Sequence, residues 1–381
     1  MTDTLSSITT RIRSKDSLDV GLLWGMIALG VTGVLMIYSA TRQALVSAGY
    51  NPHYYLERQS LFVVIGIAVM YGISLIDYRR FEMVATPLYI AGILGLIGVF
   101  FLGSSALGAQ RWFNLGLFQV QPSEFTVLFV IVAVATYCER RPEGLKLYDV
   151  WRLLLMAALP MGMIALQPDL GTAIIIVFSV SAMLIVAGVP PRFMSALAVV
   201  GAIGIVLAAY FSVLQKYQID RFVSFLNQSS SSANAQLQAL LYEVNNAKSA
   251  IGSGGLHGAG FFQGLQTILG YVPEQRTDFI FTAIGEQLGF IGSVLIVSLL
   301  GFVAYRMFRI GRNAKDTMGR VMVLGIFILF AFSCFENIGM TMGIMPVTGI
   351  PLPLLSYGGS AAIVFFAAGG VVLSVSRRSG S

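Results

Sequence analysis

Charged residues are scarce in this sequence. They make up 11% of its 381 residues, whereas a soluble domain carries about 25%. Hydrophobic residues reach 56%, and the mean hydropathy is +0.79. This composition excludes an ordinary soluble enzyme and predicts a polytopic membrane protein.

Cysteine and histidine are also rare, with two of each. Cys138 and Cys334 are expected near opposite membrane faces, much further apart than the roughly 7 Å between Cα atoms that a disulfide allows. His53 and His257 are far apart in sequence, so no histidine-based metal site is indicated. We also expect no cleavable signal peptide, because residues 1–19 are polar and the first apolar run is long enough to span a membrane.

Long apolar runs occupy most of the chain, and a membrane-spanning helix needs about 20 apolar residues. The sequence therefore predicts an all-α polytopic membrane protein with ten transmembrane helices in a single domain over residues 1–381. The expected spans are 19–39, 59–76, 82–103, 123–138, 152–167, 170–188, 193–213, 279–305, 317–335 and 360–376.

The distribution of basic residues predicts the orientation. Most of the 24 lysines and arginines fall in loops on the side of the N-terminus, which places both termini in the cytoplasm. Residues 1–18 then form a cytoplasmic tail. Because the basic residues lie in short loops next to membrane lipids, the net charge of +6 does not indicate nucleic-acid binding.

The dense polar segments all fall on the outer side. They include loop 104–122, the tight turn at 167–171 and the large extracytoplasmic loop 214–278 between the seventh and eighth spans. Leucines and valines at helical spacing in that large loop predict an amphipathic helix on the outer leaflet. The proline-rich segment 345–360 has irregular backbone, which is tolerated only when it is buried in protein or lines a wet cavity.

Three carboxylates, Glu124, Asp169 and Asp278, begin apolar spans from the outer side. A carboxylate at the mouth of an apolar helix has to be hydrated, paired or used for chemistry. Each of the three also fits a plain helix N-terminal residue. Capping is the stronger interpretation for Asp169, which follows Pro168, whereas for Asp278 capping and chemistry are balanced.

Arg111, Arg221 and Arg276 are expected at the same level as these acids. Arginine binds phosphate with a planar fork, and a carboxylate accepts a proton from a sugar hydroxyl, so the set suits a substrate with a diphosphate and hydroxyls. The glycines of 252–260 fit either a phosphate cradle or a mobile turn. Glu286, a membrane-embedded acid, requires a partner.

Several motifs in order resemble the SEDS family, whose members include RodA and FtsW. The similar motifs are GAQRW (108–112), QPSE (121–124), QPDLGT (167–172), AIGSGG (250–255), YVPEQRTDFIF (271–281), NIGM (337–340) and PVTGIPLPLLSYGG (346–359). They cover nearly the whole chain. The forms PEQRTDFIF and PVTGIPLP are more similar to RodA than to FtsW.

The resemblance implies a peptidoglycan glycosyltransferase that polymerises lipid II into β-1,4 glycan strands for cell elongation and shape. Asp278 is then the general base, undecaprenyl diphosphate the leaving group, and a class B penicillin-binding protein (a transpeptidase) the partner. It also implies location in the bacterial cytoplasmic (inner) membrane and a divalent cation, Mg²⁺ or Mn²⁺. Glu124 and Asp169 are the candidates to hold this cation or to orient the sugar. The expected substrate-binding residues are Arg111, Trp112, Gln121, Ser123, Glu124, Asp169, Arg221, Ser253, Gly254, Gly255, Gln266, Glu274, Arg276, Thr277, Ser356 and Gly358.

One position departs from the family pattern. The family commonly has a lysine three residues after the glutamate of QPSE, and Val127 stands there in this chain. Arg276 occupies a place where relatives commonly carry histidine. We hypothesise that its guanidinium compensates for the missing cation.

Two other functions remain open at this stage, a lipid II flippase and a non-catalytic scaffold for wall synthesis. A flippase needs charged groups through the bilayer, and Glu286 keeps that alternative open. The outer placement of the polar segments favours an enzyme. A secondary transporter is not indicated, because we find no paired broken helices in corresponding halves of the chain.

Overall fold

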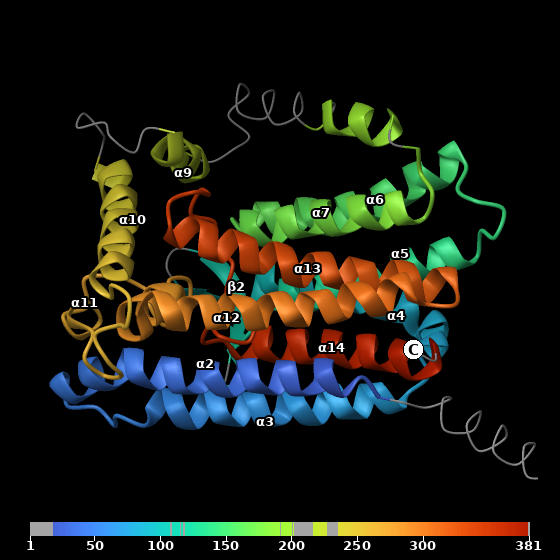
Figure 1. The fold of residues 1–381 in the computed structure, drawn as a ribbon. Coiled ribbons are helices and arrows are strands. Elements are labelled where there is room, and N and C mark those ends of the chain that lie inside the picture. The colour runs from blue at the N-terminus through green and yellow to red at the C-terminus, as the bar shows by residue number, and fades with distance from the viewer. Residues whose placement is uncertain are drawn as a thin grey trace, which may run out of the picture.

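Long apolar helices lying side by side form most of the computed structural model (Figure 1). The structure describes residues 18–379, except 107–108, 115, 117–118, 191, 200, 202–215 and 227–234. The long helices are α2 (Val20–Ser47), α3 (Tyr54–Leu75), α4 (Phe81–Leu102), α5 (Pro122–Glu139), α6 (Leu147–Leu166), α7 (Leu170–Val186), α12 (Ile280–Arg312), α13 (Thr317–Thr341) and α14 (Gly359–Ser379). A single 3-10 turn, η1 (Tyr78–Arg80), leads into α4.

Nine of the expected spans coincide with these helices. Among the described residues, eight helices are long and apolar enough to cross a membrane, and α7 is a shorter apolar helix. The span expected over 193–213 lies mostly outside the described residues, so the total of ten stays a prediction. The chain is therefore an integral membrane protein, as its composition predicted.

Helix α14 lies in the middle of the bundle. Of its most apolar stretch 89% is buried inside the protein, against 22% for α12. Phe366 of α14 and Met70 of α3 are both fully buried where these two helices pack. The peripheral helices expose their apolar side chains, as expected of helices that face lipid. Cys138 and Cys334 are buried and not disulfide-bonded.

The two described ends of the chain lie on one side of the bundle. Asp19, just before α2, accepts hydrogen bonds from Arg306 near the end of α12, with Nε 3.0 Å from Oδ1. Lys315 donates to the main-chain oxygen of Arg378 near the end of α14, at 3.3 Å. Helices α10 (Ala235–Ser253) and α11 (Leu265–Ile268) lie at the opposite end (Figure 1).

A small antiparallel sheet covers part of that opposite end. Its strands are β1 (Ser104–Ala106), β2 (Ala109–Asn114) and β3 (Gln119–Val120), in the order β1-β2-β3. The helical periodicity gave no indication of strands in this loop. Trp112 and Phe113, aromatic residues that favour a pleated half-buried surface, lie in β2.

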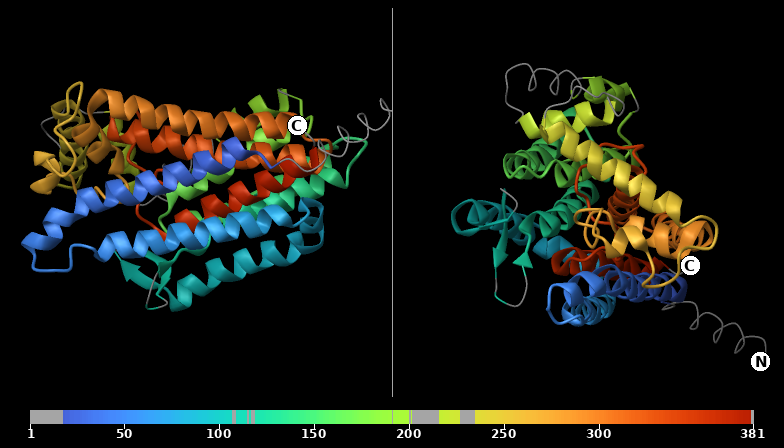
Figure 2. Two further views of the ribbon diagram at one scale, coloured as in Figure 1. Left: turned by 60° about the horizontal axis from the view of Figure 1, so that its bottom comes forward. Right: turned by 90° about the vertical axis from the view of Figure 1, so that its left-hand side faces the viewer.

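Helix α10 runs across the end of the bundle, roughly perpendicular to the long helices (Figure 2). It falls within the predicted amphipathic segment. Val244, Ala247 and Ala250 on its buried side form an apolar cluster with Phe279 and Met340. Part of its apolar face thus packs on protein, because the start of α12 and the end of α13 offer it an apolar surface, and contact with the outer leaflet stays a prediction.

Helix α12 is interrupted at Gly289, where φ is 65° and ψ is −164°. Only glycine adopts this conformation readily. The break leaves backbone groups without helical partners, and the glycine-rich loop 254–260 pairs with them. The bonds run from Ala259 N to Glu286 O (2.9 Å), from Gly260 N to Gln287 O (3.1 Å), from Phe290 N to Gly255 O (2.9 Å) and from Ile291 N to Leu256 O (3.2 Å).

Candidate active site

Asp278 lies in a turn directly before α12. The turn is closed by hydrogen bonds from Thr277 N and Phe279 N to the oxygen of Glu274, at 3.1 and 3.3 Å. The N-cap of α12 is Phe279, and no side chain caps this helix. Asp278 therefore does not act as a helix cap, which leaves its carboxylate available for other interactions.

The carboxylate of Asp278 is half-buried and accepts no hydrogen bond from the described side chains. Burial, and next the nearby carboxylates of Glu274 and Glu243, raise its pKa, which is about 6 with all neighbouring charges included. The guanidiniums of Arg221 and Arg111 lower it. A carboxylate with a pKa just below neutral is ionised at pH 7 yet binds a proton readily, as general-base catalysis requires.

Arg111 extends from β2 onto the turn that precedes α7. Its Nε donates to the main-chain oxygen of Gln167 at 2.8 Å, and its Nη2 donates to that of Pro168. The residue is half-buried. The guanidinium is therefore fixed by backbone contacts while it acts electrostatically on Asp278. Trp112 follows it on the same strand.

Arg221 reaches the site from α9 (Lys216–Leu226). Its Nη1 donates to the main-chain oxygen of Thr348 at 2.9 Å. Thr348 belongs to the proline-rich segment 345–360, which was predicted to be buried in protein or to line a cavity. Two arginines from distant parts of the chain are thereby brought to one carboxylate.

Arg276 takes a different position. Its Nη2 is 3.5 Å from Oε2 of Glu274, and its guanidinium lies 5.1 Å from the ring centroid of Tyr55. It is not among the groups that act most strongly on the pKa of Asp278. Val127 is buried in the core on α5. Whether Arg276 replaces the missing lysine at the diphosphate thus stays a hypothesis, and Arg221 and Arg111 are better placed around the acid.

Asp169 is the N-cap of α7, with Oδ1 accepting from Thr172 N at 3.2 Å. Its Oδ2 accepts from the side chains of Gln121, Ser123 and Thr172 at 2.9, 3.1 and 2.9 Å. Capping, the stronger interpretation from sequence, is what the structure shows. Gln121 and Ser123 are held in the same cluster.

Glu124 and Asp169, the two residues expected to hold a divalent cation, differ in how well they could serve as its ligands. Glu124 interacts electrostatically with Asp169, and its buried Oε2 has no hydrogen-bond partner among the described residues. No group of three potential ligands occurs in the described part of the chain. Magnesium is usually bound by one or two carboxylates together with substrate phosphates and water. Glu124 fits this mode, whereas the oxygens of Asp169 are already occupied.

Other predicted residues serve mainly to hold the site together. Ser356 Oγ donates to the oxygen of Thr277 at 2.5 Å and accepts from Leu352 N at 2.8 Å. Gly358 N donates to Gln59 Oε1 at 3.3 Å. Tyr357 N donates to the oxygen of Arg276 at 2.8 Å. The proline-rich segment is thus tied to the turn that carries Asp278.

The carboxylate of Glu286 accepts hydrogen bonds from residues of α11. Its Oε1 accepts from Gln266 N at 2.6 Å, and its Oε2 accepts from Thr267 N and Thr267 Oγ1 at 3.0 and 2.6 Å. The acid caps this short helix and is fully buried. Glu286 therefore has a structural role in holding α11. A membrane-embedded acid was the feature that kept the flippase alternative open, and these hydrogen bonds explain its presence.

Ser253 is the last residue of α10, and Gly254 and Gly255 follow it and lie against the interrupted helix α12. Ser253 Oγ donates to Ala250 O at 2.7 Å, and the oxygen of Gly255 accepts from Phe290 N. The amides of Ala259 and Gly260 are likewise used in pairing with α12. This part of the glycine-rich loop therefore serves helix packing.

Three further residues at the site were not singled out from the sequence. Asn337 donates to the main-chain oxygen of Asp278, Gly349 adjoins its carboxylate, and the buried acid Glu336 binds Thr348. A signal for Glu336 was present, because an acid just after an apolar span is a functional candidate by default.

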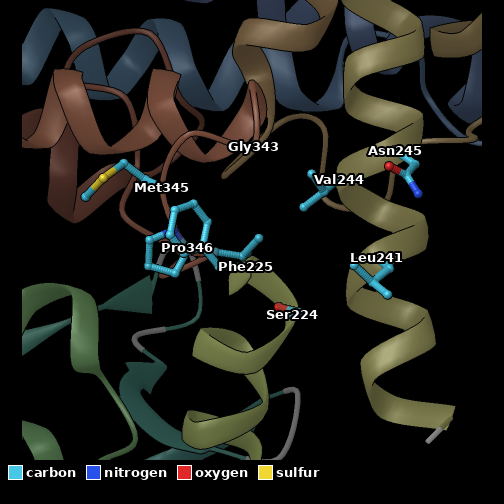
Figure 3. A pocket seen from close by; sticks show the side chains of 9 residues that line it. Ser224, Phe225, Leu241, Val244, Asn245, Gly343, Met345 and Pro346 are labelled. Atoms are coloured by element: carbon cyan, nitrogen blue, oxygen red, sulfur yellow. The ribbon is translucent and has the colours of Figure 1, made fainter. Parts of the chain in front are cut away.

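A pocket lies beside the proline-rich segment, between α9 and α10 (Figure 3). It is lined by Ser224, Phe225, Leu241, Val244, Asn245, Gly343, Met345, Pro346 and Val347. None of these residues is charged, and Asp278 is not among them. The pocket is therefore separate from the candidate acid.

Comparisons with known proteins agree with this architecture. Residues 21–380 match the family model FTSW_RODA_SPOVE, described as cell cycle protein. The chain is 36% identical over 361 residues to peptidoglycan glycosyltransferase MrdB of Escherichia coli K12, covering 95% of this chain and 94% of that protein. It is 31% identical over 371 residues to a probable peptidoglycan glycosyltransferase FtsW of Bacillus subtilis, covering 94% and 91%.

Solved structures with the same fold include the rod shape determining protein RodA of Thermus thermophilus, with a TM-score of 0.69 at 28% identity, covering 95% of this chain and 97% of that one. Another is a chain from a peptidoglycan synthase complex that coordinates polymerization and crosslinking, with a TM-score of 0.80 at 29% identity, covering 95% and 98%. The fold and site define an integral membrane protein with a candidate general base at one end of its bundle. The chain belongs to the FtsW, RodA and SpoVE family.

Proposed function

We propose that this protein is a peptidoglycan glycosyltransferase that polymerises lipid II, with Asp278 as its general base. The observation that carries the proposal is the environment of Asp278. Its carboxylate is half-buried and does not cap a helix. Its pKa is raised to about 6, and the charges of Arg111 and Arg221 act on it. The names of the relatives support the reaction class.

In this reaction Asp278 accepts the proton of the 4-hydroxyl of the acceptor GlcNAc. The oxygen attacks the anomeric carbon of the donor MurNAc as the bond from that carbon to undecaprenyl diphosphate breaks. Inversion at this carbon gives a β-1,4 link. Arg111 and Arg221 bind the departing diphosphate, since guanidinium groups pair with phosphate oxygens in a fork.

A bound Mg²⁺ or Mn²⁺ would neutralise charge on the diphosphate, and Glu124 would hold it. The candidate substrate-binding residues at the turn, Glu274, Arg276 and Thr277, are joined to one another. Thr277 Oγ1 donates to Glu274 Oε2 at 3.2 Å. We propose that Glu274, Arg276 and Thr277 contact the sugar of the substrate.

We place the outer end, with α10 and Asp278, on the extracytoplasmic side and both termini in the cytoplasm of a bacterial cell. A class B penicillin-binding protein is the proposed partner, because a structural relative belongs to a synthase complex that coordinates polymerization with crosslinking. Helix α12 exposes Phe290, Leu295 and Phe302, and these residues offer a surface for a partner's membrane helix. RodA-like motifs favour a role in cell elongation.

The test uses the purified full-length protein, labelled lipid II and a divalent metal. We expect glycan polymer from the wild-type protein and none from Asp278→Ala or Asp278→Asn, with both variants folded. Full activity in either variant would remove Asp278 from the mechanism. Movement of lipid II across liposomes without polymer would instead support the flippase, and neither activity would support a scaffold.

A further inference from the structure

Glu336 is a buried acid close to the candidate base that the reaction above does not use. It lies on α13 and is 1% exposed. Its Oε1 accepts a hydrogen bond from Thr348 Oγ1, while its buried Oε2 has no partner among the described residues. A buried carboxyl oxygen without a partner costs free energy, so its presence here calls for an explanation at this site.

Thr348 connects Glu336 to Arg221. Its hydroxyl donates to Glu336, and its main-chain oxygen accepts from Arg221 Nη1 at 2.9 Å. A single residue of the proline-rich segment therefore contacts a buried acid on one side and a cation of the candidate site on the other. Any movement of Thr348 moves the acceptor that holds the guanidinium.

Gly349, which follows Thr348, lies directly against the carboxylate of Asp278. Gly349 has φ of +79°, and a Cβ built on it would lie 3.2 Å from Asp278 Oδ2, so this close approach requires glycine. Asn337 fixes the following residue by donating to the oxygen of Ile350 at 2.7 Å. Thr348–Ile350 is thus held from α13 at both ends and lies against Asp278 in between.

Charges around Asp278 come from several elements. Arg221 from α9 and Arg111 from β2 favour its ionised form, while Glu274 from its own turn and Glu243 from α10 oppose it. Glu336 from α13 also interacts electrostatically with Asp278 and Arg221. The position of Arg221 therefore matters for the protonation of Asp278.

We propose that Glu336 is a positioning residue that holds Thr348, and through it Arg221, in place beside Asp278. This inference rests on the proposed function, because it concerns the same site. Glu336 acts through its hydrogen bond to the Thr348 hydroxyl. Its charge is not required for this role, because burial makes ionisation of the carboxyl group costly and the group that it contacts directly is a neutral alcohol.

The experiment compares full-length variants by lipid II polymerisation across pH, with kcat and KM determined separately. Glu336→Gln keeps an acceptor for Thr348, whereas Glu336→Leu removes it. Thr348→Val removes the donor and Thr348→Ser restores it. The matched control is Thr341→Val, a buried threonine on the same helix whose hydroxyl donates to Ile338 O of its own helix at 2.7 Å.

Glu336→Gln, Thr348→Ser and Thr341→Val should keep the wild-type pH profile and kcat. Glu336→Leu and Thr348→Val should each lower kcat about tenfold, the effect on a rate of losing about one hydrogen bond. The acidic limb of their profiles should move to higher pH, because a displaced Arg221 no longer favours the ionised form of Asp278. The double variant Glu336→Leu/Thr348→Val should be no slower than either single variant.

A shift to lower pH in Glu336→Gln, or a loss equal to that of Glu336→Leu, would show that the charge matters and would overturn the inference. Additive losses in the double variant, or wild-type behaviour of Thr348→Val, would also overturn it. If Glu336→Leu does not fold, Thr348→Val and its rescue by serine decide the question. Failure of the proposed function is distinct, because it requires activity in Asp278→Asn.

Discussion

The side-chain amide of Asn337 donates to the main-chain oxygen of Asp278 at 2.8 Å. The same nitrogen donates to the oxygen of Ile350 at 2.7 Å. One fully buried amide on α13 therefore joins the turn that carries the candidate base to the proline-rich segment. The geometry of the base depends on a residue that cannot reach the substrate itself.

We expect Asn337→Leu to lower both stability and polymerisation. The substitution leaves two buried carbonyl oxygens without this donor, at a cost of about 1–3 kcal/mol for each unsatisfied group. Thermal unfolding and kcat with labelled lipid II measure the two effects. Ser333→Ala, which removes a buried hydroxyl of the same helix bonded to Leu329 O at 2.7 Å, should leave kcat unchanged. Wild-type kcat in Asn337→Leu would contradict this role.

The rate of polymerisation should rise with pH through about 6. Below this value Asp278 is protonated and accepts no proton from the acceptor hydroxyl, since burial raises its pKa to about 6. A carboxylate with an ordinary pKa would give the same rise near 4. The pH dependence of kcat/KM of the purified protein reports this value. A flat profile between pH 5 and 7 would contradict a raised pKa for the essential base.

The same shift predicts that Asp278→Asn stabilises the protein at pH 7.5. Because the pKa of Asp278 is raised on folding, its contribution to stability is fully present below the unfolded pKa of about 3.9 and is lost as the pH rises through about 6. The ionised acid then costs up to about 3 kcal/mol, which a neutral amide avoids.

Thermal unfolding in detergent at two pH values checks this prediction. The difference between Asp278→Asn and wild type should be large at pH 7.5 and fall below about 1 kcal/mol at pH 4. Equal stability at both pH values would mean that the pKa of Asp278 is not raised in the folded protein. The stability difference between Asp278→Asn and wild type thus reports the cost of the negative charge at this position.

Charges of opposite sign around Asp278 should move the acidic limb in opposite directions. Arg221→Gln removes a cation that favours the carboxylate, so the limb moves to higher pH. Glu274→Gln removes an acid that disfavours it, so the limb moves to lower pH. Arg276→Gln is the matched control, because Arg276 is not among the groups that act most strongly on this carboxylate and should move the limb less than Arg221→Gln does. Shifts of the same sign in the first two variants would contradict the arrangement.

Substitutions at Glu124 and Asp169 should have different effects, one on the metal requirement and the other on stability. Glu124→Gln should raise the concentration of Mg²⁺ or Mn²⁺ needed for half-maximal activity, because its Oε2 has no other partner among the described residues. Asp169→Ala should lower the unfolding temperature instead, since an N-cap contributes about 1 kcal/mol and its other hydrogen bonds are lost as well. Titration of metal into chelator-treated protein, with unfolding measured alongside, distinguishes the two. An unchanged metal requirement in Glu124→Gln would remove it as a ligand.

The membrane architecture follows from the sequence alone. Scarce charge and long apolar runs locate nine helices, although α2 continues to Ser47 and α12 to Arg312, beyond their expected ends at 39 and 305. They do so because a helix in lipid must satisfy its own backbone and present about 20 apolar side chains. The motifs around Asp278, from QPSE to PVTGIPLP, likewise indicate the family without any coordinates. Capping by Asp169 followed from its place after Pro168.

Which polar groups meet depends on the tertiary structure. The sequence predicted Arg111 and Arg221 at the level of Asp278, but no local pattern shows that these two are among the main charges acting on it or that Glu336 of α13 joins them. The pairing of the glycine-rich loop with the break at Gly289 was equally hidden. Hydrophobic periodicity is a local property of the chain, whereas hydrogen bonds and pKa values at a site depend on distances between segments that only packing sets.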